Sequence, residues 1–143
     1  MLYKTLAFVA ALVLAGQADA ETFEVHLKNK GDQGVMVFEP AFIMAKPGDT
    51  ISFLADDKGH NVETIKGMWP EGVDAVKSEM SKPFTMTVTV EGLYGIKCTP
   101  HYAMGMVALI QVGAATNYDA ALAVEQKGKA KARFEPLFAE VQR

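Results

Sequence analysis

Residues 84–113 read FTMTVTVEGLYGIKCTPHYAMGMVALIQVG, and this stretch decides the fold. Between residues 84 and 90 apolar side chains alternate with threonines, which is the two-residue period of a half-buried β-strand. Residues 93–97 and 106–112 are two further runs of β-prone side chains. Because only Glu91 and Gly92 separate the first two runs, we expect these runs to form an antiparallel hairpin.

The chain before this stretch repeats the same period in shorter runs. Residues 21–28 alternate cleanly with His26 on the polar face, so we expect a strand on which His26 is exposed to solvent. Three more strands are predicted at residues 35–38, 42–45 and 50–54, with turns at 28–34 and 46–49. Residues 67–83 contain several Gly and Pro residues and predict a long irregular excursion, with one helical turn near residues 73–78.

Beyond Gly113 the pattern changes to a helical period. Asn117 is a candidate N-cap for a helix that ends near Gln126. A second amphipathic helix is predicted where apolar residues recur at i, i+3, i+4 and i+7 between residues 134 and 141, and Pro136 should kink or start it.

These patterns predict one all-β domain. A chain of 143 residues is long enough for one domain with a hydrophobic core and too short for two ordinary ones. We expect a Greek-key sandwich or barrel of about eight strands over residues 21–113, followed by a C-terminal helical hairpin over residues 114–143. The net charge of −3 excludes the basic balance typical of proteins that bind nucleic acid.

The first twenty residues, MLYKTLAFVAALVLAGQADA, have the pattern of a cleaved secretory signal peptide. Lys4 precedes an apolar run over residues 6–14, and Ala18-Asp19-Ala20 forms the small-residue exit. The apolar run is short for a bilayer span, although an uncleaved N-terminal anchor helix is the alternative interpretation. Cleavage would leave a mature domain of residues 21–143 outside the cytoplasm, not inserted in a membrane.

Cys98 is the only cysteine of the chain, so no internal disulfide can form even though export leads to an oxidising compartment. A lone thiol there is either a small buried core residue or a metal ligand. Cys98, His101 and Met106 follow one another at the spacing C-x2-H-x4-M between two predicted strands. Thiolate, imidazole and thioether are soft to borderline donors, which suit copper in both of its oxidation states.

Other metals explain this donor set less well. A structural zinc site would recruit a further Cys, His or carboxylate, and the C-x-x-C-H motif of haem attachment does not occur. A trigonal copper site needs a second imidazole, and His60 is the remaining candidate once His26 is assigned to a polar strand face. His60 precedes Cys98 by 38 residues, so only the tertiary fold could bring it to the loop.

Each candidate ligand also has an ordinary explanation. A buried free Cys is common, and Met106 is one of eight methionines that could simply fill the core. Two rival functions remain open at this point: a copper carrier with an exchangeable site, and a thiol enzyme in which Cys98 is the nucleophile and His101 its base. The enzyme reading offers no role for Met106.

Two runs of the chain resemble the small blue-copper proteins, or cupredoxins, and within that family the pseudoazurins. These runs are KGHNVE at residues 58–63 and GLYGIKCTPH at residues 92–101, with Met106 beyond them. The resemblance covers the whole mature chain. It implies one copper ion cycling between Cu(I) and Cu(II), with His60, Cys98 and His101 as in-plane ligands and Met106 as the axial ligand.

The resemblance also implies roles for residues beside the ligands. Asn61 would be a hydrogen-bond donor that fastens the ligand loop, Thr99 and Pro100 would shape the turn after Cys98, and Gly59 would let the backbone approach the metal closely. Among the methionines, three are candidates to border the site, namely Met36, Met68 and Met104. Three others are assigned to packing: Met44, Met80 and Met86.

The function implied by the resemblance is electron transfer without enzymatic activity. The protein would be a soluble, monomeric carrier in the periplasm that takes one electron from a cytochrome c and passes it to a denitrification enzyme such as copper nitrite reductase. Lysines would surround an apolar docking patch at the His101 edge, and their positive field would steer the protein toward acidic partners, less strongly in salt. The candidate lysines are Lys30, Lys58, Lys77 and Lys97.

Overall fold

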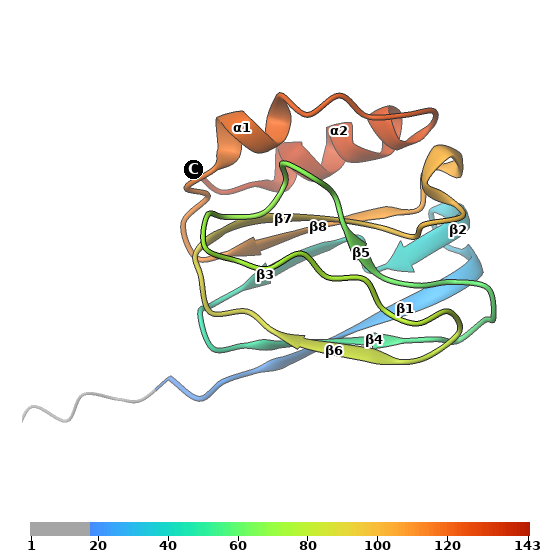
Figure 1. Cartoon of the computed structure of the whole chain (residues 1–143), viewed down its shortest axis with the longest axis horizontal. Helices are drawn as coiled ribbons and strands as arrows, with labels where there is room; N and C mark the ends of the chain where they lie inside the picture. Colours follow the sequence, from blue (N-terminus) through green and yellow to red (C-terminus); the bar gives the residue numbers. More distant parts are fainter. Residues whose placement is uncertain (1–17) are drawn as a thin grey trace, which may run out of the picture.

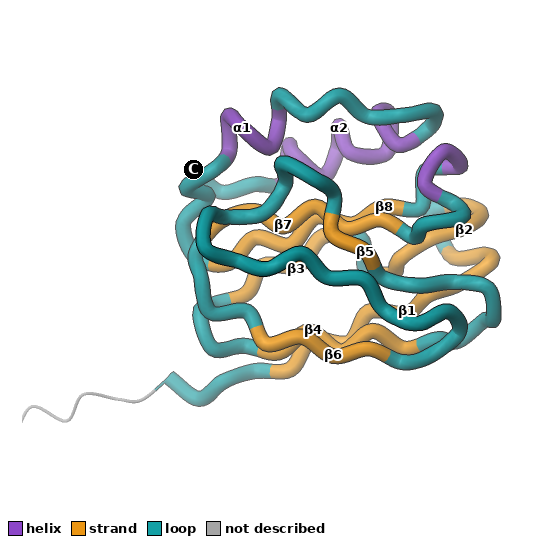
Figure 2. Tube along the Cα trace, viewed as in Figure 1, coloured by secondary structure: helices purple, strands orange, loops and turns teal. Residues whose placement is uncertain are grey.

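The computed structural model describes residues 18–143, so the predicted signal peptide lies outside the described residues except for its last three positions. Figure 1 shows two sheets packed face to face, with two short helices against the outer side of one of them. Figure 2 shows that long loops connect the strands at both ends of the sandwich. None of the helices within residues 18–143 is long and apolar enough to cross a membrane.

The first sheet contains four strands in the order β2-β1-β4-β6. Neighbours are antiparallel except β1 and β4, which are parallel. The bounds of these strands are β1 Thr22–Gly31, β2 Gly34–Glu39, β4 Thr50–Leu54 and β6 Phe84–Thr87.

The second sheet also contains four strands, in the order β3-β8-β7-β5. Here β3 and β8 are parallel, and the other pairs are antiparallel. The prediction of an all-β sandwich with about eight strands is confirmed for the described residues. The bounds of these strands are β3 Phe42–Ala45, β5 Glu63–Thr64, β7 Gly92–Lys97 and β8 Val107–Val112.

The first sheet has one face exposed to solvent, whereas β7 and β8 of the second sheet are buried on both faces because the helices cover its outer side. On β1, Val25 and Leu27 face the core while their neighbours stay more exposed, as expected of a strand with one solvated face. Every residue of β8 is buried, because α2 (Ala130–Glu140) covers the outer face of its sheet. Phe134 and Phe138 of α2 pack there in a second hydrophobic cluster, separate from the main core between the sheets.

The helical hairpin differs in detail from the prediction. Helix α1 (Tyr118–Leu122) ends before the predicted Gln126. Asn117 stands at its N-cap position, but its side chain bonds both backbone groups of Leu93 (2.6 and 3.0 Å) and so fastens α1 to β7. Pro136 neither starts nor ends α2. It is tolerated inside the helix because it lies on the exposed side, where water can reach the carbonyl that loses its partner.

The predicted hairpin of residues 84–97 is wrong. Strand β6 pairs with β4 in the first sheet, whereas β7 pairs with β8 and β5 in the second. The chain leaves the first sheet after Val88, whose backbone still exchanges hydrogen bonds with Gly48 and Asp49 (2.7 and 2.9 Å). A short polar pair such as Glu91-Gly92 therefore serves here as the crossing between two layers, and no local pattern distinguishes this use from a hairpin turn.

Two further local predictions fail because segments predicted as helical turn or loop pair with neighbouring strands. Residues 73–78 form no helical turn; they run extended beside β5, with a bridge between Glu63 and Lys77. The predicted loop at residues 28–34 shrinks to the two-residue turn Asp32-Gln33, because β1 extends to Gly31. In both places pairing with a neighbouring strand overrides the polar composition of the segment.

Asp49 is a buried carboxylate, 1 % exposed, that joins the start of β1 to the turn before β4. Its Oδ1 accepts the Glu21 N–H (2.8 Å) and its Oδ2 accepts the Lys46 N–H (2.7 Å). These two hydrogen bonds favour the charged carboxylate and hold the pKa of Asp49 below its ordinary value.

We expect Asp49→Asn to lower the thermal unfolding midpoint near neutral pH, because the amide keeps the shape of the carboxylate without its charge. The folded-state pKa of Asp49 lies below the unfolded value of about 3.9, so this stabilisation is present above that pH and is lost as the pH falls through the folded pKa. The gap in midpoint between variant and parent should therefore narrow below about pH 4. Melting curves across this range measure it, with the exposed Asp74→Asn as control; a gap of constant size would contradict the prediction.

Candidate metal centre

The candidate centre lies at the end of the sandwich where β7 leads into β8 (Figure 1). Cys98 follows directly after β7, and Met106 directly precedes β8. The Cys98 N–H donates to the Met106 carbonyl (3.0 Å), which extends the pairing of the two strands by one hydrogen bond. Residues 98–106 are therefore a closed loop whose two ends are held together by the sheet.

The loop is folded tightly on itself around the backbone of His101. The His101 carbonyl accepts hydrogen bonds from the N–H groups of Met104 and Met106, both at 3.1 Å, and the His101 N–H donates to the Cys98 carbonyl (3.2 Å). A short 3-10 helix, η1 (Tyr102–Met104), fills the bend. This bonding gives His101 one backbone position relative to both Cys98 and Met106.

His60 reaches the loop from the segment between β4 and β5. Its carbonyl accepts the Ser81 N–H, and the Gly59 N–H donates to Ser81 Oγ, both at 2.8 Å. At the ring, Nε2–H donates to Asn29 Oδ1 (2.8 Å). In a neutral imidazole this donor role of Nε2 leaves Nδ1 with a free lone pair, directed away from Asn29.

The structure brings His60, Cys98 and His101 together. Cys98 Sγ lies 3.8 Å from His60 Nδ1 and 3.5 Å from His101 Nδ1, and the two Nδ1 atoms are 3.0 Å apart. Metal bonds of about 2.0 Å to nitrogen and about 2.3 Å to sulfur place neighbouring ligand atoms about 3–4 Å apart. The three separations fall in this range, so the three donor atoms fit one small ion.

Burial tunes the chemistry of these side chains. His60, Cys98 and Met106 are fully buried, whereas His101 is partly exposed. Burial lowers the pKa of His60, and the neighbouring His101 lowers it further. Burial raises the pKa of the Cys98 thiol, although the backbone N–H groups of Asn61 and His101 partly oppose this by stabilising the thiolate. The neutral imidazole offers a lone pair, and a soft cation that displaced the thiol proton would gain a thiolate ligand, so the two groups together suit such an ion.

Met106 belongs to the same cluster of buried core residues as Cys98. Its backbone is bonded on both sides, through its carbonyl to Cys98 and through its N–H to His101. The predicted fourth ligand therefore lies in the buried part of the loop, with its position set by the same hydrogen bonds that set the positions of the other two loop residues.

Asn61 fastens the loop as the sequence predicted. Its Nδ2 donates to Thr99 Oγ1, and its Oδ1 accepts the Thr99 N–H, both at 2.8 Å. Thr99 Oγ1 in turn donates to Glu63 Oε2 (2.5 Å). A Cβ added at Gly59 would meet nothing within 4 Å, and the φ of +90° is what favours a glycine there. The close approach of this backbone to the metal stays a prediction.

Asn29 is the residue that the sequence reading missed. It is exposed and lies on β1, far along the chain from the loop, yet it holds the His60 ring and its backbone N–H bonds Asp57 Oδ2 (2.7 Å). Nothing in the sequence around Asn29 distinguishes it from any polar residue near a turn. His26, by contrast, bonds Asp56 (2.9 Å) and takes no part in the centre.

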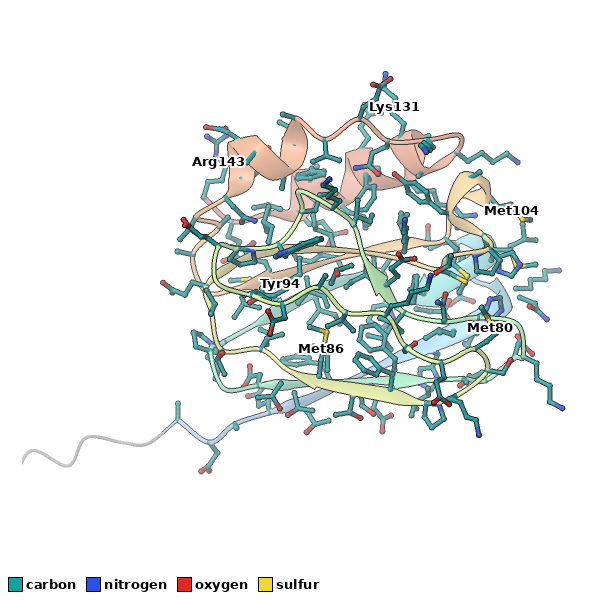
Figure 3. The ribbon with its side chains drawn as sticks, viewed as in Figure 1. Met80, Met86, Tyr94, Met104, Lys131 and Arg143 are labelled. Atoms are coloured by element: carbon teal, nitrogen blue, oxygen red, sulfur yellow. The ribbon has the colours of Figure 1, made fainter. Side chains whose placement is uncertain are left out.

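The methionines around the site are distributed differently from the prediction. Figure 3 shows Met80 and Met104 at the same end of the sandwich, and they are 46 % and 41 % exposed. Met80, assigned to core or surface packing from the sequence, is thus an exposed residue at the end of the sandwich that also carries Met104, and these two exposed side chains are here called the apolar patch. Met36 is half-buried against the main core, whereas Met68 is fully buried in the second cluster and does not border the site.

Comparison with known proteins links this geometry to copper. The family model of copper binding proteins of the plastocyanin/azurin family matches residues 25–113. The chain is 52 % identical to the pseudoazurin of Paracoccus pantotrophus over 144 residues, which cover 99 % of each chain. It is 48 % identical to the pseudoazurin of Methylorubrum extorquens over 139 residues, covering 96 % of this chain and 93 % of the other.

Among solved structures, too, the chain is similar to pseudoazurins. The crystal structure of pseudoazurin from Methylobacterium extorquens AM1 superposes with a TM-score of 0.82 at 48 % identity, covering 85 % of this chain and 99 % of that one. The family match ends at residue 113, where the sandwich ends, whereas the similarity to the pseudoazurin of Paracoccus pantotrophus continues through both helices.

We expect Asn61→Ala to speed metal release and to lower the free energy of unfolding by about 2 kcal/mol, since it removes two partly buried hydrogen bonds from the buried Asn61 amide to Thr99. Gln111→Ala is the matched control. Gln111 is another buried amide, and it ties β8 to Gly113 and Gln142 at a distance from the ligand loop.

Urea unfolding and the rate of metal transfer to a chelator measure the two effects. The control should lose a similar amount of stability and keep the parent rate of metal release. Equal release rates for Asn61→Ala and the parent would contradict a fastening role for Asn61.

Proposed function

Because the chain belongs to the plastocyanin/azurin family of copper-binding proteins, and within it to the pseudoazurins, we propose that His60, Cys98 and His101 would hold one copper ion, with Met106 as a fourth ligand. The fold is the cupredoxin fold. Proteins of this family carry electrons on copper and are not enzymes. The finer proposal is that this chain is a monomeric one-electron carrier of the periplasm.

The observation that carries the ligand assignment is the approach of two imidazole nitrogens and one thiol sulfur to within 3.8 Å of one another, inside a largely buried site. Two imidazoles, one thiolate and a weak thioether are the donor set of blue-copper electron-transfer sites. The compact group contains no carboxylate, which hard ions would prefer.

Copper, when bound, supplies one-electron chemistry by alternating between Cu(I) and Cu(II). The residues of the chain keep the ligands in one arrangement for both states. Asn29 orients the His60 ring, and the Asn61 backbone N–H stabilises negative charge on the Cys98 sulfur. Because these contacts come from packed strands and loops, the ligands need to move little when an electron arrives or leaves.

His101 is the proposed route for the electron to and from the surface. It is the one candidate ligand that is partly exposed, while His60, Cys98 and Met106 are fully buried. A partner that covers the exposed ring edge would come as close to the ion as the fold permits. The exposed side chains of Met80 and Met104, at the same end of the sandwich, supply the apolar surface that such a contact would bury.

The copper-loaded, oxidised protein should absorb strongly in the visible through thiolate-to-copper charge transfer, and Cys98→Ser should abolish this band. His26→Ala is the control, because the third histidine bonds Asp56 away from the centre and its loss should leave the spectrum unchanged. Absorption and electron paramagnetic resonance spectra test both variants. A Cys98→Ser protein that kept its colour would overturn the ligand assignment.

Two experiments on the copper-loaded protein distinguish electron transfer from the two rival functions, thiol catalysis and copper delivery. A thiol enzyme would need a reactive Cys98, but this thiol is fully buried and its pKa is raised by burial. Alkylation of Cys98 in the copper-loaded protein should therefore be blocked. A copper carrier would release its ion readily to a chelator, whereas a buried four-ligand site should retain it.

The proposed docking surface combines the apolar patch with nearby lysines. Lys30, Lys58 and Lys77 are exposed. Lys97 contributes less to the field than the sequence suggested, because only 25 % of its side chain is exposed, its Nζ lies 3.8 Å from Glu63, and it stands over the Tyr102 ring. Positive charge beside an apolar patch suits an acidic redox partner. The proposed acceptor is a denitrification enzyme such as copper nitrite reductase, and the proposed donor is a cytochrome c.

We expect the double variant Lys58→Glu, Lys77→Glu to slow electron transfer to copper nitrite reductase about tenfold at low ionic strength, because it reverses the field that steers encounter. The difference should vanish near 1 M salt, where charges are screened within about 3 Å. Lys46→Glu is the control, since Lys46 lies in the turn between β3 and β4 at the other end of the sandwich (Figure 1). Second-order rate constants of electron transfer, measured by stopped flow, test this prediction. Equal rate constants for the double variant and the control at low salt would refute electrostatic steering by these lysines.

The proposed export and processing agree with the contacts at the start of the described chain. Cleavage after Ala20 would turn the Glu21 N–H into an α-ammonium group. That nitrogen lies 2.8 Å from the Asp49 carboxylate, so processing would replace a hydrogen bond by an ion pair. The mass of the protein isolated from the periplasm, which should begin at Glu21, tests this proposal.

A further inference from the structure

The guanidinium group of Arg133 on α2 binds three backbone carbonyls in two other parts of the fold. Its Nη2 donates to the Val35 carbonyl (2.8 Å), and its Nη1 donates to the carbonyls of Met36 (2.9 Å) and Gly105 (3.2 Å). Among residues 18–143, the ion pairs do not include Arg133. The guanidinium thus directs its donors at β2 and at the ligand loop.

The Gly105 carbonyl belongs to the peptide group that joins Gly105 to Met106. Because a peptide group is planar, an anchor on this oxygen also sets the direction of the Met106 N–H, which donates to the His101 carbonyl (3.1 Å). Arg133 therefore acts on the backbone between two of the proposed ligands without touching their side chains.

The Met36 carbonyl is the second important acceptor. Met36 has a φ of +52°, in the left-handed region that residues with a side chain rarely adopt. Its side chain packs against the core cluster that contains Cys98 and Met106. A hydrogen bond from a charged donor offsets part of the backbone cost and holds Met36 against that cluster.

The segment between the two helices touches the same loop at two more points. The Lys129 N–H donates to the Ala103 carbonyl (2.9 Å), and the Tyr102 hydroxyl donates to Gln126 Oε1 (2.5 Å). At Gly128 an added Cβ would lie 2.4 Å from the Ala103 oxygen, so the two segments are in close backbone contact. The C-terminal segment thus contacts the loop at residues 102, 103 and 105.

We propose that Arg133 is a positioning residue of the metal centre: its bonds to Gly105 and Met36 make the C-terminal helix set the placement of Met106 and of the loop that carries it. This inference rests on the proposed function, in which Met106 is a copper ligand. It gives the helices beyond the sandwich a role at the site. It also makes a geometric demand that suits arginine better than lysine, because the three bonds leave two nitrogens of a rigid planar group, whereas lysine donates from a single nitrogen on a flexible stem.

The test compares Arg133→Lys, which keeps the charge, with Arg133→Gln, which removes it. In the metal-free protein, both should speed hydrogen exchange at the Gly105 and Met106 amides about tenfold, the effect of losing one charge-assisted hydrogen bond. In the copper-loaded protein, both should change the relative intensities of the charge-transfer bands and the reduction potential in the same direction. Phe138→Ala is the control, because it removes a buried α2 side chain that packs on Tyr118. It should lower the melting temperature and leave spectrum and potential unchanged.

Three other outcomes would overturn the proposal. If Arg133→Lys behaves like the parent and only Arg133→Gln shifts the potential, Arg133 acts through its charge alone. If neither variant changes the exchange or the spectrum, the contacts do not position the loop. If Phe138→Ala alters the spectrum equally, general loosening is the cause. A parent protein that shows no charge-transfer band would refute the proposed function instead, while hydrogen exchange in the metal-free protein would still report on Arg133.

Discussion

The hydrogen bond from the Cys98 N–H to the Met106 carbonyl, 3.0 Å long, is the contact on which the centre depends. It extends the antiparallel ladder of β7 and β8 beyond the last paired residues, Lys97 and Val107, and so closes the loop that carries three of the four proposed ligands. Because β7 and β8 are buried between the main core and the helices, this closure is held by two strands whose residues are almost all buried. The loop is therefore short, rigid and attached at both ends.

A rigid loop alone would not make a site, because a buried thiol and a buried imidazole are both costly in their charged forms. The fold meets this cost with neutral donors and acceptors from other elements. Asn29 accepts from His60, and Asn61 bonds the residue after Cys98. In the part of the chain that the structure describes, no buried side-chain nitrogen or oxygen lacks a hydrogen-bond partner. A Cys98 thiolate would be stabilised by a nearby positive charge, which the proposed copper ion would supply.

Most of the candidate site could be predicted from the sequence, because three of the four proposed ligands lie in one short segment. The spacing of Cys98, His101 and Met106 on either side of a strand-to-strand loop is a local property, and His60 followed from there being few histidines to choose from. The alternation along β1 likewise identified its buried face. The hairpin prediction failed because Glu91-Gly92 suits a turn within one sheet and a crossing between two sheets equally well.

What the sequence by itself determined was the proposed set of donor atoms, the alternation of the strands and the helical character of the tail, since composition and short-range period depend only on neighbours along the chain. The tertiary structure alone decided that Asn29 faces His60 and that Arg133 reaches Gly105 and Met36. It also decided which strands share a sheet. These contacts join residues far apart in the chain, and their formation depends on how two sheets and a helix pack together, which no local pattern encodes.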